Sequence, residues 1–194
     1  LSRSPQRSKR HSPKNKEESL SSLAANYIRM EDQASNACRN RWKALIFLCA
    51  SLLVLSLNNN ILNVALPSIA NDLHATSSEL QWVIDSYIII FAALLLTMGS
   101  IGDRRGRKTA LLAGLGLFAF VSLLAGLTNS IFILILLRGF MGIAGAIIMP
   151  STLSILSATF TDPKERSQAI AYWAATFGLG IGIGPVLGGW LLVH

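Results

Sequence analysis

The chain has 194 residues, of which 52% are hydrophobic and 14% charged, and its mean hydropathy is +0.49. This composition is typical of an integral membrane protein rather than of a soluble domain. The net charge of +7 does not indicate nucleic acid binding, because the cations form no patch on a soluble domain. Ten of the 17 precede Ala44, four lie between Arg104 and Lys108, and two more, Lys164 and Arg166, lie in another connection between apolar segments.

Residues 1–42 are rich in Ser, Arg, Lys, Asn and Pro and hold few large apolar side chains. They cannot bury a core, so we expect a disordered, basic cytoplasmic tail. Position 1 is not a Met, and Met30 lies 13 residues before the first apolar segment. Met30 is therefore a candidate start residue, with residues 1–29 as leader or upstream translation. A transit peptide is a weaker alternative for this Arg- and Ser-rich stretch.

Five apolar segments follow, and each is long enough to cross a hydrocarbon core of about 30 Å at about 1.5 Å per residue. They cover residues 43–66, 80–101, 108–127, 131–156 and 168–192. The connections alternate between those without Lys or Arg, 67–79 and 128–130, and those with them, 102–107 and 161–167. Because basic connections stay in the cytoplasm, we predict an all-α, multi-pass protein of the plasma (inner) membrane with a cytoplasmic N-terminus. Trp82 and Tyr87 are expected at the outer interface.

The stretch from Gly99 to Lys108, GSIGDRRGRK, is the only strongly charged one between two long apolar segments. Asp103 is its one acid, and its cations are Arg104, Arg105, Arg107 and Lys108. Three glycines, Gly99, Gly102 and Gly106, allow a sharp backbone turn, so we predict a hairpin of two helices. The residues alone favour a basic anchor that fixes topology, with Asp103 near the N-terminus of the next helix.

Three polar side chains lie inside apolar segments. Arg138 is in the fourth, where an arginine costs about 2.5–3.5 kcal/mol and normally faces a bundle interior or a water-filled cavity. Asp85 is the only carboxylate well inside a segment, and Asn58 lies in the first. At about 1.5 Å per residue, Arg138, Asp85 and Asn58 lie about 10, 7 and 12 Å below the outer ends of their helices, so they could line one cavity.

Asp85 is a candidate proton-titratable group for coupling, since burial and a nearby cation would shift its proton affinity in opposite directions. The alternatives are an interfacial Asp85 that faces water and an Arg138 that snorkels from a helix-packing stripe.

Small residues and prolines mark two of the segments. Arg138, Gly142, Ala146 and Pro150 recur every four residues and share one face of the fourth. In the fifth segment, the run GLGIGIGPVLGGW places Gly180, Gly184 and Gly188 on one face, adds Gly189, and includes Pro185, which removes a helix hydrogen bond. We expect these residues to serve helix packing and bending. A dinucleotide-binding interpretation fails because no strand precedes the glycines.

Enzymatic and metal chemistry are not indicated. The three histidines, His11, His74 and His194, have no metal-ligand spacing. No apolar segment holds a Ser/His, paired Asp or HExxH arrangement. We therefore predict no metal, no cofactor and no enzymatic activity.

Residues 43–194 resemble the major facilitator superfamily and, within it, the fourteen-span drug:proton antiporter branch. The stretch at 99–108 matches the signature loop between spans two and three, with Gly99, Asp103, Arg104, Gly106, Arg107 and Lys108 in place. RGFMGIAGA at 138–146 is similar to the fourth-span motif, GIGIGPVLGG at 180–189 to the fifth-span antiporter motif, and LNNNILNVALP at 57–67 to the first-span motif.

The first-span stretch departs from the family at two positions. Asn58 stands where the family usually has Asp, and Asn60 replaces a usual Thr. An amide cannot titrate, so any coupling role of the first-span acid is absent or has moved. Asp85 is the expected substitute.

The resemblance implies a secondary active transporter that exports hydrophobic or cationic small molecules against proton entry by rocking two six-helix halves. It also implies a role for Arg138 in proton transfer and a latch from Asp103 and Arg107 to the second half. The expected partners are a small-molecule substrate, protons, the lipid bilayer and a missing C-terminal half, with the proton gradient in place of any cofactor.

The chain ends near the end of its fifth apolar segment, so we expect an N-terminal fragment that does not transport by itself. Two alternatives stay open: a metabolite uniporter or symporter of the same superfamily, and a truncated membrane fragment without transport activity.

Overall fold

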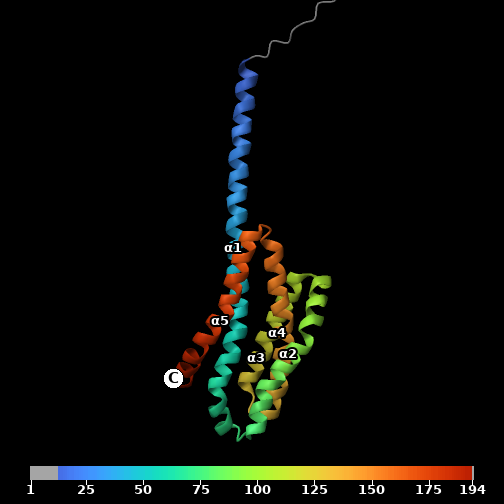
Figure 1. Cartoon of the computed structure of the whole chain (residues 1–194), viewed down its shortest axis with the longest axis vertical. Coiled ribbons are helices and arrows are strands. Elements are labelled where there is room, and N and C mark those ends of the chain that lie inside the picture. Colours follow the sequence, from blue (N-terminus) through green and yellow to red (C-terminus); the bar gives the residue numbers. More distant parts are fainter. Residues whose placement is uncertain (1–12, 194) are drawn as a thin grey trace, which may run out of the picture. The chain divides into compact units, whose positions relative to one another are not determined.

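The protein consists of long helices joined by short connections. The computed structural model describes the backbone of residues 13–193 and the side chains of residues 41–190. Its helices are α1 (Pro13–Asp72), α2 (Ser77–Arg105), α3 (Arg107–Leu127), α4 (Ile131–Thr159) and α5 (Pro163–Val193) (Figure 1). Each contains a stretch long and apolar enough to cross a bilayer, and each predicted span lies within one of them. The predicted all-α membrane fold is confirmed.

The first helix begins much earlier than the first predicted span. The sequence predicts disorder up to residue 42, whereas residues 13–42 are helical in the structure, and residues 1–12 lie outside the described part. The difference has a local cause. Proline suits the first turn of a helix, and residues 14–42 contain neither glycine nor a further proline to interrupt it. The chain divides into two compact units, one up to Lys43 and one from Ala44 on. The second unit holds the predicted spans and is described below.

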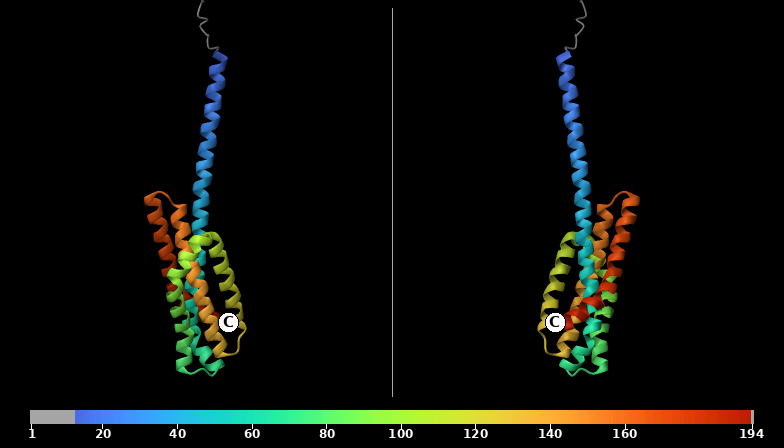
Figure 2. Two further views of the ribbon diagram at one scale, coloured as in Figure 1. Left: turned by 90° about the vertical axis from the view of Figure 1, so that its right-hand side faces the viewer. Right: turned by 90° about the vertical axis from the view of Figure 1, so that its left-hand side faces the viewer.

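Within the second unit, connections of the same kind meet at the same end of the helix bundle. The connections after α1 and α3 lie at one end, and those after α2 and α4, which carry the basic residues, lie at the other (Figure 2). This arrangement agrees with the alternation in the sequence. The helix α4 is the most enclosed. In its most apolar stretch 50% of the residues are buried, whereas the corresponding share is 11% in α2 and in α5.

The connection between α2 and α3 is shorter than predicted. The sequence indicates a loop over residues 102–107, but α2 continues to Arg105 and α3 starts at Arg107, so that Gly106 alone separates them. Gly106 has φ 100° and ψ 119°, a conformation that residues with a Cβ rarely adopt. Gly99 and Gly102 lie inside α2 rather than in the turn, and a Cβ added to either would meet its neighbours at ordinary contact distance. Arg104 and Arg105 lie in the last turn of α2, where their positive charges interact favourably with the negative end of the helix dipole.

The helices α2 and α4 pack along a seam of glycines. A Cβ added to Gly142 would lie 2.7 Å from the Tyr87 carbonyl oxygen, and one added to Gly139 would lie 2.8 Å from Ile90 Cδ1. The Ser86 hydroxyl donates to the Ile135 carbonyl across the same seam, at 3.2 Å. The backbones of α2 and α4 are therefore as close as glycine permits, and this close approach places Arg138 against α2.

A second close contact joins α1 to α5. A Cβ on Gly180 would collide with Ser56, and one on Gly184 with Asn60. The Ser56 hydroxyl donates to the Phe177 carbonyl at 2.9 Å. This contact fixes the rotation of α1, whose next turn carries the three consecutive amides.

Candidate functional site

The centre of the candidate site is the guanidinium group of Arg138, whose side chain is only 3% exposed. Its Nε donates to the Val83 carbonyl at 3.2 Å, and its Cζ lies 4.9 Å from the centroid of the Tyr87 ring. Because Val83 and Tyr87 are one helical turn apart on α2, one face of that helix receives the arginine. The close approach of α2 and α4 at Gly142 brings this face within reach.

The other two guanidinium nitrogens bind amides of α1. Nη1 donates to Asn58 Oδ1 at 2.6 Å and Nη2 donates to Asn59 Oδ1 at 3.0 Å. The third amide of the run has a different partner, since Asn60 Nδ2 donates to the Ser56 carbonyl of its own helix at 2.7 Å. Arg138 thus links α1, α2 and α4 through neutral oxygens, and none of these contacts is to a carboxylate.

The structure brings Arg138 and Asn58 together, as their similar depths predict, but it does not bring Asp85 to them. Asp85 is half-buried and lies midway between Val83 and Tyr87 in the sequence. At about 100° per residue, its Cβ points away from the face that Arg138 contacts. Shared depth alone therefore does not place the three polar groups in one cluster.

A cavity of about 370 Å³ reaches this site from the end of the bundle that holds the α1–α2 and α3–α4 connections. Asn58, Arg138 and Met141 line its inner part, and Asp72 and Asn129 line its part near those connections. The residues come from α1, α3, α4 and the adjoining connections. The cavity can admit water or a small polar group to the guanidinium.

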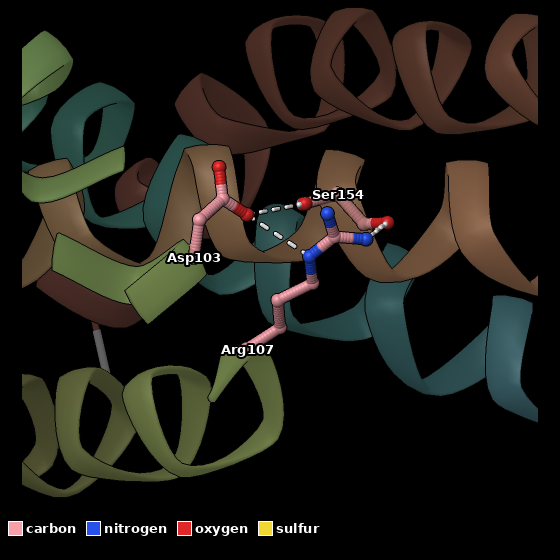
Figure 3. A network of polar contacts seen from close by, with 3 residues as sticks. All are labelled: Asp103, Arg107 and Ser154. Carbon is pink, nitrogen blue, oxygen red and sulfur yellow. Dashed lines mark hydrogen bonds and ion pairs between the residues drawn. The ribbon is translucent and has the colours of Figure 1, made fainter. Parts of the chain in front are cut away.

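A second polar network lies near the other end of the bundle (Figure 3). Asp103 Oδ1 accepts from Arg107 Nε at 2.9 Å and from the Ser154 hydroxyl at 3.1 Å. Arg107 Nη1 in turn donates to the Ser154 carbonyl at 3.1 Å. The network ties the ends of α2 and α3 to α4. Arg104 and Lys108, which belong to the same motif, are exposed.

The small residues and prolines of the predicted packing faces fall into two groups. Pro150 lies 3.4 Å from the position of a Cβ on Gly99, so the face of α4 that carries Arg138, Gly142 and Pro150 packs along α2. The glycines of α5 do not all lie against another helix. Gly180, Gly184 and Gly188 face α1, whereas a Cβ added to Gly189 would have no atom within 4 Å. Pro150 and Pro185 both lie inside helices that continue through them.

Sequence analysis missed two side chains of the site. Asn59 is one of three consecutive asparagines, and residue type does not distinguish it from the other two. Each amide in an apolar span requires a hydrogen-bond partner, and this requirement could have pointed to Asn59. Tyr87 was expected at the outer interface, but it is only 5% exposed, lies under the guanidinium and stacks on Phe91 with centroids 5.8 Å apart. The signal that could have found it is its spacing of four residues from Val83, which places both on one helical face. Trp82 is 54% exposed.

Comparisons with known proteins agree with this arrangement. The model of the Major Facilitator Superfamily matches residues 48–194. Over 153 residues, the chain is 44% identical to the multidrug efflux pump LfrA of Mycolicibacterium smegmatis, covering 79% of this chain and 30% of that protein. It is 36% identical to the methyl viologen resistance protein SmvA of Salmonella typhimurium, with 79% and 31% covered.

A further relative carries a different kind of name. The riboflavin transporter RibZ of Clostridioides difficile is 33% identical over 156 residues, which are 80% of this chain and 34% of that protein. The chain therefore spans about a third of the length of the curated relatives it matches.

These relatives are transport and resistance proteins rather than enzymes by their names, and the matched region includes the Arg138 site and the Asp103 network. Together with the helical membrane fold, the match to three quarters of the chain settles the family. This chain belongs to the major facilitator superfamily.

Proposed function

We propose that the chain forms part of a secondary active transporter of the drug:proton antiporter branch, which exports hydrophobic or cationic small molecules by alternating access. The names of its relatives support export, since LfrA is named as a multidrug efflux pump and SmvA as a resistance protein. In this proposal the protein lies in the plasma membrane with its N-terminus in the cytoplasm, because the basic connections lie at one end of the bundle.

One observation carries the proposal: Arg138 is buried beside a cavity, and none of the hydrogen bonds that its side chain makes within residues 41–190 is to a carboxylate. An arginine inside a membrane span is costly and is normally retained for function. Held by Asn58, Asn59 and the Val83 carbonyl, it is a fixed positive charge whose hydrogen bonds can be exchanged for those of water or a substrate group. Such an exchange would couple occupancy of the cavity to the contact between α1 and α4.

Proton coupling requires a titratable group, which Asn58 cannot supply. In our proposal Asp85 has this role from the opposite face of α2, where it is half-buried and free to meet a part of the transporter outside α1 and α4. Proton binding would neutralise Asp85 and favour its movement into an apolar contact, whereas release would return it to water.

The gating part of the proposal concerns the Asp103 network. Asp103 and Arg107 bind Ser154 of α4 in this structure, and the other carboxylate oxygen of Asp103 can serve a second contact. We propose that this second contact is the latch to the other half of the transporter, made in one of the two alternating states.

A test of the coupling uses the protein expressed from its complete gene in cells loaded with a fluorescent cationic dye. Efflux should depend on the proton gradient, fall strongly in Asp85→Asn, which cannot titrate, and survive in Asp85→Glu, which can. The amount of inserted protein is matched by immunoblotting. Gradient-dependent efflux at the normal rate in Asp85→Asn would exclude Asp85 as the coupling acid.

The alternative of metabolite transport rests on RibZ, which is named as a riboflavin transporter. Position 58 holds an amide rather than an acid, and this favours the same alternative, because metabolite transport of that kind would not require a proton to bind at this position. Accumulation of riboflavin or another metabolite without any effect of a protonophore, in cells that show no dye efflux, would favour it over drug export.

A further inference from the structure

A third feature of the bundle is a cavity that takes no part in the Arg138 site. It has a volume of about 410 Å³ and lies among α3, α4 and α5. Its polar lining consists of Arg107, Ser154, Ser157 and Arg166, and its apolar lining includes Pro150 and Leu153. Ser154 follows Arg138 by 16 residues on α4, which corresponds to about 24 Å along the helix. The cavity is therefore separate from the candidate transport site.

The charge of this lining is unbalanced. Two arginines line the cavity and no lining residue is acidic. The nearby Asp103 is occupied by Arg107 and Ser154, and Asp162 accepts from the backbone N–H groups of Lys164 and Glu165 at 3.0 Å. Because Arg107 is ion-paired with Asp103, Arg166 supplies the remaining positive charge, and a ligand in the cavity would meet a net charge of about +1, which favours an anion.

The lining also presents hydrogen-bond donors that the structure leaves available. Arg107 is held in place through Nε and Nη1 (Figure 3), and within residues 41–190 its Nη2 makes no hydrogen bond. Within residues 41–190, the structure shows no hydrogen bond for the side chains of Arg166 and Ser157. Two guanidinium groups and a hydroxyl thus face one cavity, a donor set suited to a phosphate.

The position of the cavity indicates where such a phosphate would come from. Arg107 is the first residue of α3, Ser157 lies two residues before the end of α4, and Arg166 lies in the first turn of α5. All three are at the ends of membrane-spanning helices, where lipid headgroups lie. The exposed Leu153 continues the lining towards the middle of α4, as an acyl chain beside the headgroup would require.

From these observations we infer that the cavity lined by Arg107, Ser157 and Arg166 binds the phosphate of an anionic glycerophospholipid. The bound lipid bridges α3, α4 and α5. The inference does not depend on the transported substrate or on proton coupling.

The test uses the protein expressed from its complete gene, purified in detergent and stripped of lipid. Binding of phosphatidylglycerol and of phosphatidylcholine is titrated by native mass spectrometry. Arg166→Gln should weaken phosphatidylglycerol binding about fivefold, the usual effect of one cation near an anionic lipid, and Arg166→Lys should restore most of it. Lys164→Gln is the matched control, because it removes one cation from the same helical turn but Lys164 does not line the cavity.

Three results would overturn the inference. Equal weakening by Lys164→Gln and Arg166→Gln would show a general effect of surface charge. Equal affinity for phosphatidylcholine and phosphatidylglycerol would remove the preference for an anion. Displacement of phosphatidylglycerol by millimolar inorganic phosphate would show a site for a free anion in place of a lipid.

Discussion

Arg138 is a buried cation whose partners are all neutral. Its three donor nitrogens bind the Asn58 and Asn59 side chains and the Val83 carbonyl, and the Tyr87 ring lies over its Cζ. Hydrogen bonds to a charged group contribute about 1.5–3 kcal/mol, and leaving a buried donor without a partner costs a similar amount. The two consecutive amides therefore stabilise the arginine in place of a carboxylate, so position 58 of α1 holds no titratable group.

The role of Asn58 can be tested by truncation. We expect Asn58→Ala to lower the free energy of unfolding by about 1–3 kcal/mol, because it leaves the Arg138 Nη1 without its 2.6 Å acceptor. Asn60→Ala is the matched control, since among residues 41–190 the Asn60 side chain bonds to the Ser56 carbonyl of its own helix alone. The measurement is unfolding in mixed detergent–SDS micelles, followed by tryptophan fluorescence. Equal losses in the two variants would contradict the assigned contact.

The residues of the site were only partly predictable, for a geometric reason. The distance of a residue from its helix end gives its depth, so the contact of Asn58 with Arg138 could be anticipated. Depth does not give the direction of a side chain around the helix axis. Asp85 has the right depth but projects from the opposite face of α2, whereas Tyr87, expected at the interface, lies on the face that Arg138 contacts.

At the scale of the helices, glycine decides how closely the elements approach. The α2–α4 seam depends on Gly139 and Gly142, and the α1–α5 contact depends on Gly180 and Gly184. In a membrane, where lipid is as apolar as the side chains, such close packing is a main source of helix association. The seam also brings the Tyr87 ring and the Val83 carbonyl to Arg138.

The α2–α4 seam predicts an asymmetry between two glycine substitutions. Gly142→Ala should lower stability by about 1–3 kcal/mol, because its Cβ would lie 2.7 Å from the Tyr87 carbonyl oxygen, a backbone atom that cannot turn aside. Gly116→Ala, whose Cβ would have no atom within 4 Å, should be neutral or stabilise α3 by up to about 1 kcal/mol. Thermal unfolding of the purified protein measures both. A tolerated Gly142→Ala would show that the two helices are less closely packed.

Hydropathy predicted every span but not where the helices end. The segment 80–101 is the apolar part of α2, yet the helix continues through Asp103 to Arg105 because nothing before Gly106 interrupts it. The same applies to α1, which begins at Pro13. Hydropathy reports where a chain is apolar, whereas a helix ends where the backbone must leave helical φ and ψ, as it does at Gly106.

At the scale of the molecule, the second unit combines a buried cationic site with a polar network near the opposite end. Arg138 joins α1, α2 and α4, and the Asp103 network joins the ends of α2 and α3 to the same α4. The helix α4 is therefore common to both and is also the most enclosed helix. In the proposed transporter, a change in the contacts of Arg138 would reach the Asp103 network through α4.

The most direct measurement is transport by the protein expressed from its complete gene and reconstituted in liposomes with an acidic interior. The account predicts that a fluorescent cationic dye accumulates inside, that a protonophore abolishes this accumulation, and that Arg138→Gln lowers the initial rate about tenfold or more through the loss of charged hydrogen bonds. Arg138→Lys should retain part of the rate, since an ammonium keeps the charge but cannot reach Asn58, Asn59 and Val83 together. Dye movement that is unaffected by the gradient, or a normal rate in Arg138→Gln at equal protein content, would contradict the account.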